Sequence, residues 1–311
     1  MSRIHEALKK AEEQRGASQG GRVVEPVPPA EIVATEAVAE VGSMAERKPE
    51  SAATGIPSFA SPYTLDTLLA RCPQGRWSPD KKTMLFLSAE EQEYGGEEFR
   101  TLRSRLYQIR EKQSLKKVLV TSALPKEGKS FVAANLAQVM VCQEGRRALL
   151  IDSDLRGSRL HETLGTSSTP GLSEYLLGEK DEFAVMQQGP MENLFFIPSG
   201  RTVANPAELV ANGRMRFLLN RLEALFDWII IDSPPAVPVS DAGLIANYCD
   251  GVLMVVRSNA TPFDMARKAR QEFRDKHLIG VVLNGIATES SYTQYYYTAY
   301  GRSNGRQQSQ G

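Results

Sequence analysis

From residue 118 onward, short unbroken runs of apolar residues alternate with segments whose apolar positions recur every three or four residues. The first pattern predicts buried β-strands and the second predicts amphipathic helices. Continuous apolar strands separated by helices are typical of a parallel sheet that is covered on both faces. We therefore predict an α/β fold with a mostly parallel sheet and helices on both faces. The predicted strands are residues 118–121, 148–152, 194–198, 228–232, 251–256 and 279–283.

Helices are predicted between these strands. Asn205 and Pro206 are typical of a helix start, with Pro at the first helical position. The other predicted helices are residues 88–113, 130–144, 213–225, 239–247 and 261–276, with short helices inside 160–177. Within 88–113, the expected buried residues are Tyr94, Leu102, Leu106 and Ile109.

The first 80 residues lack this alternation. The spacing of apolar residues in 1–15 predicts a short amphipathic helix. This helix is either a frayed surface helix or a docking peptide that orders on a partner. Residues 16–80 hold eight of the seventeen prolines among Ser, Ala, Glu and Gly, and this composition predicts a disordered linker. The folded domain is expected over residues 81–288, beginning with an edge strand or a connection at 81–87. A flexible tyrosine-rich tail is expected over residues 289–311.

The strand at 118–121 runs into a loop that ends in Gly128-Lys129-Ser130, and a helical pattern starts at once. Strand, loop and helix in this order are the context of a phosphate-binding loop, in which Lys neutralises phosphate charge and Ser holds Mg²⁺. The usual first Gly of the pattern is replaced by Ala123, so another turn must open the loop. The alternative is an ordinary helix start. The expected nucleotide contacts are Pro125, Lys126, Glu127, Gly128, Lys129, Ser130 and Phe131.

Acidic residues stand where two of the predicted strands end. Asp152 and Asp154 follow one strand, and Asp232 ends another. Ligands of parallel sheets bind at the carboxyl ends of the strands, and Mg²⁺ prefers a few carboxylates together with phosphate oxygens and water. An acid after a strand is also ordinary turn chemistry. Two strand ends beside a phosphate loop favour a site for magnesium and a nucleotide.

Five of the ten tyrosines fall within residues 292–300, followed by a polar run to the end of the chain. One explanation is an aromatic edge strand, and another is a low-complexity segment. A third is a set of phenol nucleophiles on a flexible segment that reaches a neighbouring active site. These five residues are Tyr292, Tyr295, Tyr296, Tyr297 and Tyr300.

Charge and composition narrow the classes of function. The formal net charge is zero, so the chain as a whole offers no electrostatic argument for nucleic acid, and we predict no such partner. Cys72, Cys142 and Cys249 are far apart, with neither zinc-like spacing nor a disulfide framework. No run approaches the roughly 20 apolar residues of a membrane helix. We expect a soluble, cytoplasmic protein, and any association with a membrane must come through a partner.

The Gly-Lys-Ser loop, the segment Ile-Asp-Ser-Asp-Leu-Arg156 and the segment Ile-Asp-Ser-Pro-Pro235 resemble the Walker A, A′ and B motifs of bacterial tyrosine kinases. These are P-loop autokinases that control exopolysaccharide and capsule export. The resemblance covers about residues 90–301. It implies a P-loop NTPase fold of the partitioning-ATPase-like type, with ATP and Mg²⁺ as cofactors. Leu124 stands where the partitioning ATPases themselves carry a second lysine.

The resemblance also implies roles for individual residues. Lys129 would stabilise the transferred phosphate, while Ser130, Asp154 and Asp232 would hold the metal. Asp152 would orient or deprotonate the incoming tyrosine. Arg156 would balance the carboxylates or touch phosphate, and Asn284 is either an adenine contact or a strand-end cap.

The segment Glu97-x-x-Arg100-x-x-Arg103 is similar to the motif that packs subunits of the family into a ring. The resemblance therefore implies a homo-oligomer that phosphorylates its tail in trans, a membrane activator of the chain-length-determinant type and a cognate phosphotyrosine phosphatase. Two alternatives are a P-loop ATPase switch that acts by ATP-dependent association and a non-enzymatic interaction protein. Another open feature is the run of basic residues at 267–276, which is either a solvated face or a contact for an acidic patch on a neighbour or a membrane partner.

Overall fold

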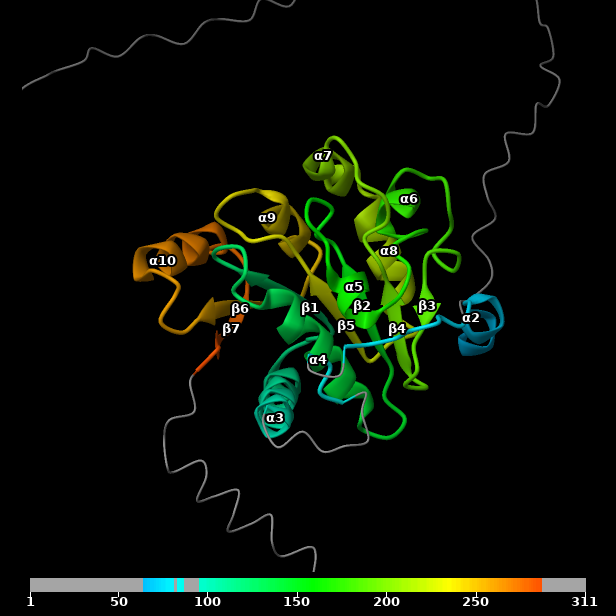
Figure 1. The fold of residues 1–311 in the computed structure, drawn as a ribbon, viewed down its shortest axis with the longest axis horizontal. Coiled ribbons are helices and arrows are strands. Elements are labelled where there is room, and N and C mark those ends of the chain that lie inside the picture. The colour runs from blue at the N-terminus through cyan, green and yellow to red at the C-terminus, as the bar shows by residue number, and fades with distance from the viewer. Residues whose placement is uncertain (1–63, 81–82, 87–94, 287–311) are drawn as a thin grey trace, which may run out of the picture. The chain divides into compact units, whose positions relative to one another are not determined.

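The computed structural model describes residues 64–80, 83–86 and 95–286. These residues contain a seven-stranded sheet with the order β3-β4-β2-β5-β1-β6-β7 (Figure 1). Every pair of neighbours is parallel except β3 and β4, so the predicted fold class is confirmed. The strands are β1 Lys117–Ser122, β2 Ala148–Asp152, β3 Gln187–Gln188, β4 Leu194–Ile197, β5 Trp228–Asp232, β6 Gly251–Arg257 and β7 Leu278–Asn284.

Helices cover both faces of the sheet because its central strands are apolar on both sides. Val118 and Val120 face the cluster that α3, α4 and α5 bury, whereas Leu119 faces the cluster of α6, α7, α8, α9 and α10. None of the helices in the described part of the chain is long and apolar enough to cross a bilayer. The helices are α2 Leu65–Arg71, α3 Gly96–Lys112, α4 Lys129–Val141, α5 Leu160–Leu164, α6 Leu172–Leu176, α7 Pro206–Ala211, α8 Arg214–Leu222, α9 Asp241–Ala246 and α10 Phe263–Glu272.

The segment just before the predicted domain is folded, which corrects the boundary at residue 81. Residues 64–80 were expected in the disordered linker, yet they form α2 and an extended piece packed on the core. Leu68 is completely buried and Cys72 nearly so. Gln74 forms a parallel bridge with Gln188, and the Trp77 ring packs edge-on against Phe196. The apolar pattern of this segment is short, and it does not reveal the distant surface that buries it.

Replacing Leu68 by Ala tests this packing. We expect the free energy of unfolding to fall by about 2–4 kcal/mol, because the substitution leaves a cavity in a site with no solvent exposure. The neighbouring Leu69 is 47% exposed, so Leu69→Ala should change the stability by less than about 0.5 kcal/mol. Urea denaturation of the two variants measures the difference. Equal, small losses would show that the segment does not pack as described.

The start of the helix predicted over 88–113 lies outside the described residues, and its described part forms α3. Helix α3 starts at Gly96, after Gly95 with a left-handed φ of 97°. Leu106 is buried as predicted, and Phe99, which was not predicted, is buried too. Leu102 and Ile109 are partly buried, while Ser88 and Tyr94 lie outside the described residues.

The four described residues before this helix, 83–86, form no strand, so the edge-strand alternative is wrong for them and the connection is right. Two of their backbone amides donate to side chains of α4, Leu85 N to Asn135 Oδ1 at 2.8 Å and Phe86 N to Gln138 Oε1 at 3.3 Å. The edge strand β3 was missed, since two glutamines carry no strand pattern. The predicted helix at 1–15 and the tyrosine-rich tail at 289–311 lie outside the described residues.

Candidate active site

The phosphate loop lies between β1 and α4, where the sequence predicted it. Ala123 is fully buried, and the chain takes its left-handed turns later, at Lys126 with φ 66° and at Gly128 with φ 96°. Position 128 is also crowded, because an added Cβ atom would lie 2.0 Å from Asn284 Nδ2 and would displace that side chain. The loop therefore forms without a glycine at its first position.

Glu127 is the buried side chain that shapes this loop. It is 4% exposed, and its Oε2 atom accepts a hydrogen bond from Leu124 N at 2.9 Å. Its Oε1 atom accepts a hydrogen bond from the hydroxyl of Thr261, which precedes α10. Arg257 donates from Nη1 to the Lys126 carbonyl at 3.0 Å, and Asn284 donates from Nδ2 to the Glu127 carbonyl at 2.9 Å. The ends of β6 and β7 thus hold the loop from outside.

Lys129 faces the predicted carboxylates. Its Nζ atom lies 2.9 Å from Asp154 Oδ2 and 4.0 Å from Asp232 Oδ1. Burial opposes the charge of Lys129, but Asp232 and Asp154 outweigh it and raise the pKa of the ammonium group above its usual value. A fixed positive charge thus stands at the start of α4, where backbone N–H groups also point outward.

Asp152 and Asp232 lie side by side on neighbouring strands and are both almost completely buried. Burial raises the pKa of each carboxyl group above its ordinary range, and the Asp232 charge raises that of Asp152 further. Ser158 donates a hydrogen bond to Asp152. The Ser130 hydroxyl hydrogen-bonds to the Asp232 carboxyl and, with Lys129, lowers its pKa in part. The ionised forms of these two buried carboxylates therefore lower the stability of the folded protein.

Arg156 is bound in a way that the sequence did not predict. Its Nε and Nη2 atoms donate to the two oxygens of Asp241 at 2.8 and 3.0 Å. Asp241 is 1% exposed and is the first residue of α9. An acid in the first turn of a helix is a recognisable signal, but its arginine partner lies 85 residues away. The pair fastens the loop after β2 to α9.

The remaining predicted residues are more scattered. Pro125 and Lys126 are exposed on the loop, whereas the Phe131 ring packs against Phe99 at a centroid distance of 5.8 Å. Asn284 holds the loop, which favours the strand-end alternative for its role. The five tail tyrosines lie outside the described residues.

The three residues of the predicted oligomerisation motif all lie on α3. Glu97 Oε2 and Arg100 Nη1 form an exposed ion pair at 3.0 Å. The third residue, Arg103, donates from Nη1 to the Val139 carbonyl at 2.8 Å, near the end of α4.

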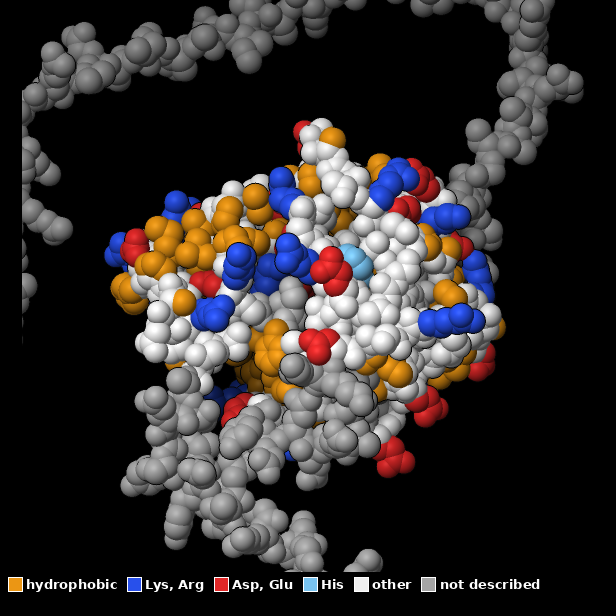
Figure 2. All heavy atoms as spheres, in the orientation of Figure 1, with side chains coloured by type: hydrophobic (Ala, Val, Ile, Leu, Met, Phe, Trp, Pro, Cys, Tyr) orange, Lys and Arg blue, Asp and Glu red, His pale blue; other side chains and the backbone are white. Residues whose placement is uncertain are grey.

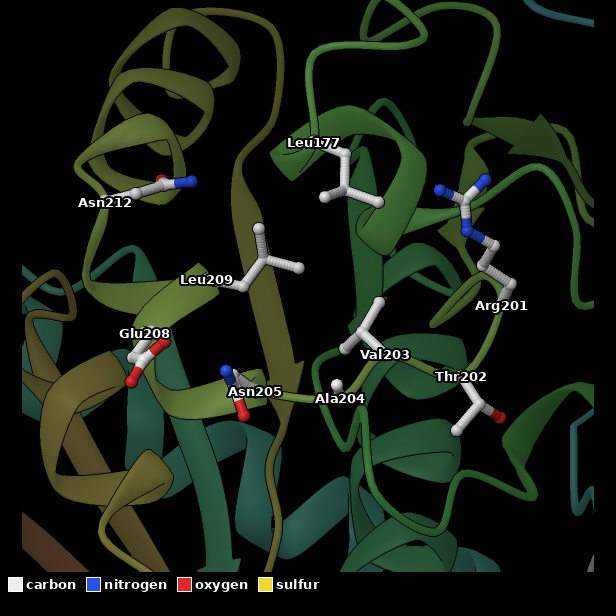
Figure 3. Close-up of a pocket in the computed structure, with 9 residues that line it drawn as sticks. All are labelled: Leu177, Arg201, Thr202, Val203, Ala204, Asn205, Glu208, Leu209 and Asn212. Atoms are coloured by element: carbon white, nitrogen blue, oxygen red, sulfur yellow. The ribbon is translucent and has the colours of Figure 1, made fainter.

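The structure also has an open hollow of about 550 Å³ formed by the end of α6, the loop after β4 and α7. Leu177, Val203 and Leu209 point toward its middle, with Arg201 and Glu208 at opposite sides (Figure 3). None of its lining residues belongs to the phosphate loop or to the set of carboxylates. The hollow is therefore a separate feature from the site around Lys129.

The residues around Lys129 suit one magnesium ion that also binds phosphate. No group of three or more His, Cys, Asp or Glu side chains in the described ranges could cage a metal ion alone. Asp232 Oδ1 is buried without a hydrogen-bond partner among the described residues, and the Ser130 hydroxyl lies beside the same carboxyl group. A hydroxyl and one or two carboxylates, completed by phosphate and water, are the ligands that Mg²⁺ accepts.

Comparison with known proteins agrees with this geometry. A family model described as an AAA domain matches residues 126–263. The tyrosine-protein kinase YwqD of Bacillus subtilis (strain 168) is 34% identical over 210 residues, which cover 66% of this chain and 88% of that protein. The tyrosine-protein kinase wzc of Salmonella typhimurium is 32% identical over 207 residues. That match covers 66% of this chain but only 29% of wzc, so the chain spans less than a third of the larger relative.

A solved structure shows the same likeness in three dimensions. The kinase domain of the Escherichia coli tyrosine kinase ETK is 31% identical, with a TM-score of 0.60. The match covers 63% of this chain and 77% of that one. Sequence, fold and the arrangement around Lys129 agree, and the predicted resemblance is confirmed. The chain belongs to the bacterial tyrosine kinases and is a protein-tyrosine kinase built on a P-loop fold.

Proposed function

We propose that this kinase transfers the γ-phosphoryl group of ATP to the tyrosines at 292–300 of another copy of the chain. In this reaction the phenol oxygen forms a bond to phosphorus, the bond to the leaving oxygen of ADP breaks, and the phenol loses its proton. The observation that supports the site most strongly is the position of Lys129, 2.9 Å from Asp154 and 4.0 Å from Asp232 at the end of a phosphate loop. Phosphoryl transfer depends mainly on such positioning and charge neutralisation.

In the proposed site, Ser130, Asp154 and Asp232 hold Mg²⁺ directly or through water. The bound ion supplies positive charge against the phosphate oxygens. Lys129, which neutralises the carboxylates in the absence of nucleotide, neutralises phosphate when the nucleotide binds. The backbone of residues 125–131 surrounds the phosphates, and the contacts of Glu127 keep that backbone in place.

Asp152 is proposed to orient the tyrosine and to accept its proton. An ordinary aspartate is a weak base for a phenol whose pKa is about 10. Burial and the neighbouring Asp232 raise the pKa of Asp152, which brings the acid and the phenol closer in proton affinity. The transfer is then late and partial rather than a complete abstraction before attack.

A mixing experiment tests both the acceptor and the trans mechanism. One chain carries Asp232→Asn and keeps its tail tyrosines, while the other is active and has all five tail tyrosines replaced by Phe. With γ-labelled ATP and Mg²⁺, we expect label on tyrosines of the Asp232→Asn chain in the mixture and in neither chain alone. Label on the chain without tail tyrosines would overturn the acceptor assignment. Release of free phosphate with no labelled chain would favour the ATPase switch.

The proposed partners follow from the same family membership. We propose that copies of the chain form a ring through α3, where the side chains of Glu97 and Arg100 are 60% and 51% exposed. Arg103 would hold α3 on α4 within each subunit. A membrane activator of the chain-length-determinant type would bring the kinase to the inner face of the membrane, and a phosphotyrosine phosphatase would reverse the reaction. The process served is proposed to be exopolysaccharide or capsule synthesis and export.

Replacing Glu127 by Ala should weaken ATP binding about tenfold. The substitution leaves the Leu124 amide and the Thr261 hydroxyl without their acceptor, so the loop loses its fixed shape. Glu127→Gln keeps side-chain oxygen and nitrogen atoms at the same place and should stay within about threefold of the unmodified chain. The measurement is the KM for ATP beside kcat. An equal rise in KM for the two variants would show that the negative charge, and not the hydrogen bonding, matters.

A further inference from the structure

One side of α10 carries an unpaired basic and aromatic surface. Phe263, Arg267 and Arg270 are spaced i, i+4 and i+7, so they follow one another along one stripe of the helix. We call these three residues the basic stripe. The Phe263 side chain is 82% exposed, the highest value among the large hydrophobic residues that the structure describes as exposed. Figure 2 shows hydrophobic and basic side chains together over the area of α10.

The basic stripe differs from an ordinary solvated helix face. Ala269 and Phe273 face the core, while the acidic residues Asp264 and Glu272 lie off the stripe, on the side of Lys268. Within the described part of the chain, the side chains of Arg267 and Arg270 form neither an ion pair nor a hydrogen bond. Lys268 has acidic residues four positions away in both directions. Arg267 has only Asp264, three positions before it, and Arg270 has no acidic residue three or four positions away.

The chain leaves the described structure next to this helix. Strand β7 follows α10 in the chain and pairs in parallel with β6, so its carboxyl end and the start of α10 lie at the same edge of the sheet. Ile286 is the last described residue of the chain, and it is 60% exposed. Tyr292 follows six residues later, a span of roughly 20 Å at most. The stretch from there to Tyr300 is long enough to lie along α10, whose ten residues extend roughly 15 Å.

Phosphorylation gives that segment a negative charge. After Glu289 the chain contains no acidic residue, and it carries Arg302 and Arg306. Residues 292–300 themselves contain no charged side chain, so the unmodified segment offers the stripe no negative charge. Each phosphate on tyrosine adds a charge of about −1.5 to −2 and oxygens that accept paired hydrogen bonds from arginine. The aromatic ring that remains can pack against Phe263.

We propose that the basic stripe of α10 binds the phosphorylated tyrosine segment, residues 292–300, of this kinase. The inference rests on the proposed function, because that reaction supplies the phosphate. The stripe retains the product of the reaction on the side of the sheet where the tail leaves the fold. The stripe does not bind the unphosphorylated segment, so it holds the tail only after the phosphate has been transferred.

A binding measurement with synthetic peptides tests the proposal without using kinase activity. The probe is a fluorescent peptide of residues 290–304, phosphorylated at Tyr295 and Tyr297, beside the same peptide without phosphate. The protein is the full chain with its five tail tyrosines replaced by Phe, so that no internal segment competes. The test variant adds Arg267→Gln and Arg270→Gln. The matched control instead adds Lys268→Gln and Lys112→Gln, which removes the same charge elsewhere.

We expect the phosphorylated peptide to bind the parent and control proteins alike, and to bind the test variant at least tenfold more weakly. Binding should weaken as salt is raised. All three proteins should melt at the same temperature, since the changed residues are exposed. Equal binding of both peptides, or equal loss in test and control variants, would overturn the proposal. So would loss of binding to acidic lipid vesicles in the test variant with phosphopeptide binding intact. Failure of autophosphorylation would leave these peptide results unchanged, which separates the two proposals.

Discussion

The variant Lys129→Met is expected to transfer phosphate to tyrosine at least about 100-fold more slowly than the unmodified chain. Methionine fills a similar volume but supplies no charge. In the nucleotide-free protein, Asp154 loses its partner at 2.9 Å and Asp232 loses the cation at 4.0 Å. In the proposed complex, the phosphates lose the same cation. The measurement is label on tyrosine from γ-labelled ATP, together with nucleotide affinity.

The control for this prediction is Lys126→Met in the same loop. Lys126 is exposed, and only its backbone carbonyl takes part in a described contact, the one with Arg257. Its replacement should keep the rate within about threefold. A melting curve for each variant separates loss of activity from loss of fold, because two buried carboxylates without Lys129 lower the stability at neutral pH. Equal effects of the two substitutions would show that Lys129 has no special place in the site.

Asp232→Asn is the second prediction, and it has opposite effects on activity and on stability. Activity should fall at least about 100-fold, because the residue proposed to hold the metal becomes neutral. The nucleotide-free protein, however, should become more stable at pH 7.5. Burial raises the pKa of Asp232 to about 6, so ionising this carboxyl group in the folded state is unfavourable. The asparagine side chain has the same shape and never ionises.

The pH dependence gives the sign of this effect. The ordinary pKa of aspartate is about 3.9. Between roughly pH 4 and pH 6, the folded protein therefore holds a proton that the unfolded chain has lost, and stability falls as the pH rises through this window. Above pH 6 the loss of stability is complete, and it is on the order of a few kcal/mol. Asp232→Asn removes this loss of stability. The free energies of unfolding of the variant and the unmodified chain should therefore differ at pH 7.5 and agree below pH 4.

Urea denaturation in the presence of a chelator and without nucleotide measures this difference. Asp241→Asn is the matched control, since Asp241 is equally buried but binds Arg156 through two hydrogen bonds. That substitution should destabilise the protein, because it breaks a charged pair. A loss of stability for Asp232→Asn at pH 7.5 would contradict the prediction and would mean that ionised Asp232 supports the fold.

Much of the site was predictable because its signals are local in the chain. The apolar strand before the loop, the sequence Gly128-Lys129-Ser130 and the helix after it are contiguous. Asp152 and Asp232 end strands that their own residues define, and β2 and β5 have the bounds that the sequence predicted. The rule that ligands bind at the carboxyl ends of parallel strands then brought these distant segments together correctly.

The contacts that fix the site were not predictable, because each joins residues far apart in the chain. Glu127 and Thr261 are separated by 134 positions, and Arg156 and Asp241 by 85. Arg103 was expected on an oligomer surface, yet it bonds to the end of α4 within the subunit. A side chain's type indicates what it can bind, but only the fold brings the partner within reach.

The amino-acid sequence by itself determined the order of the six parallel strands and the helices between them, the phosphate loop and the acids at the strand ends. All of these arise from neighbouring residues, through apolar periodicity and the backbone geometry of a strand-to-helix turn. The tertiary structure alone decided that residues 64–80 belong to the fold, that Glu127 braces the loop and that Lys129 faces both carboxylates. These features depend on burial and on distances between segments. Burial and these distances are set when the helices pack on the two faces of the sheet, so the local sequence pattern does not contain them.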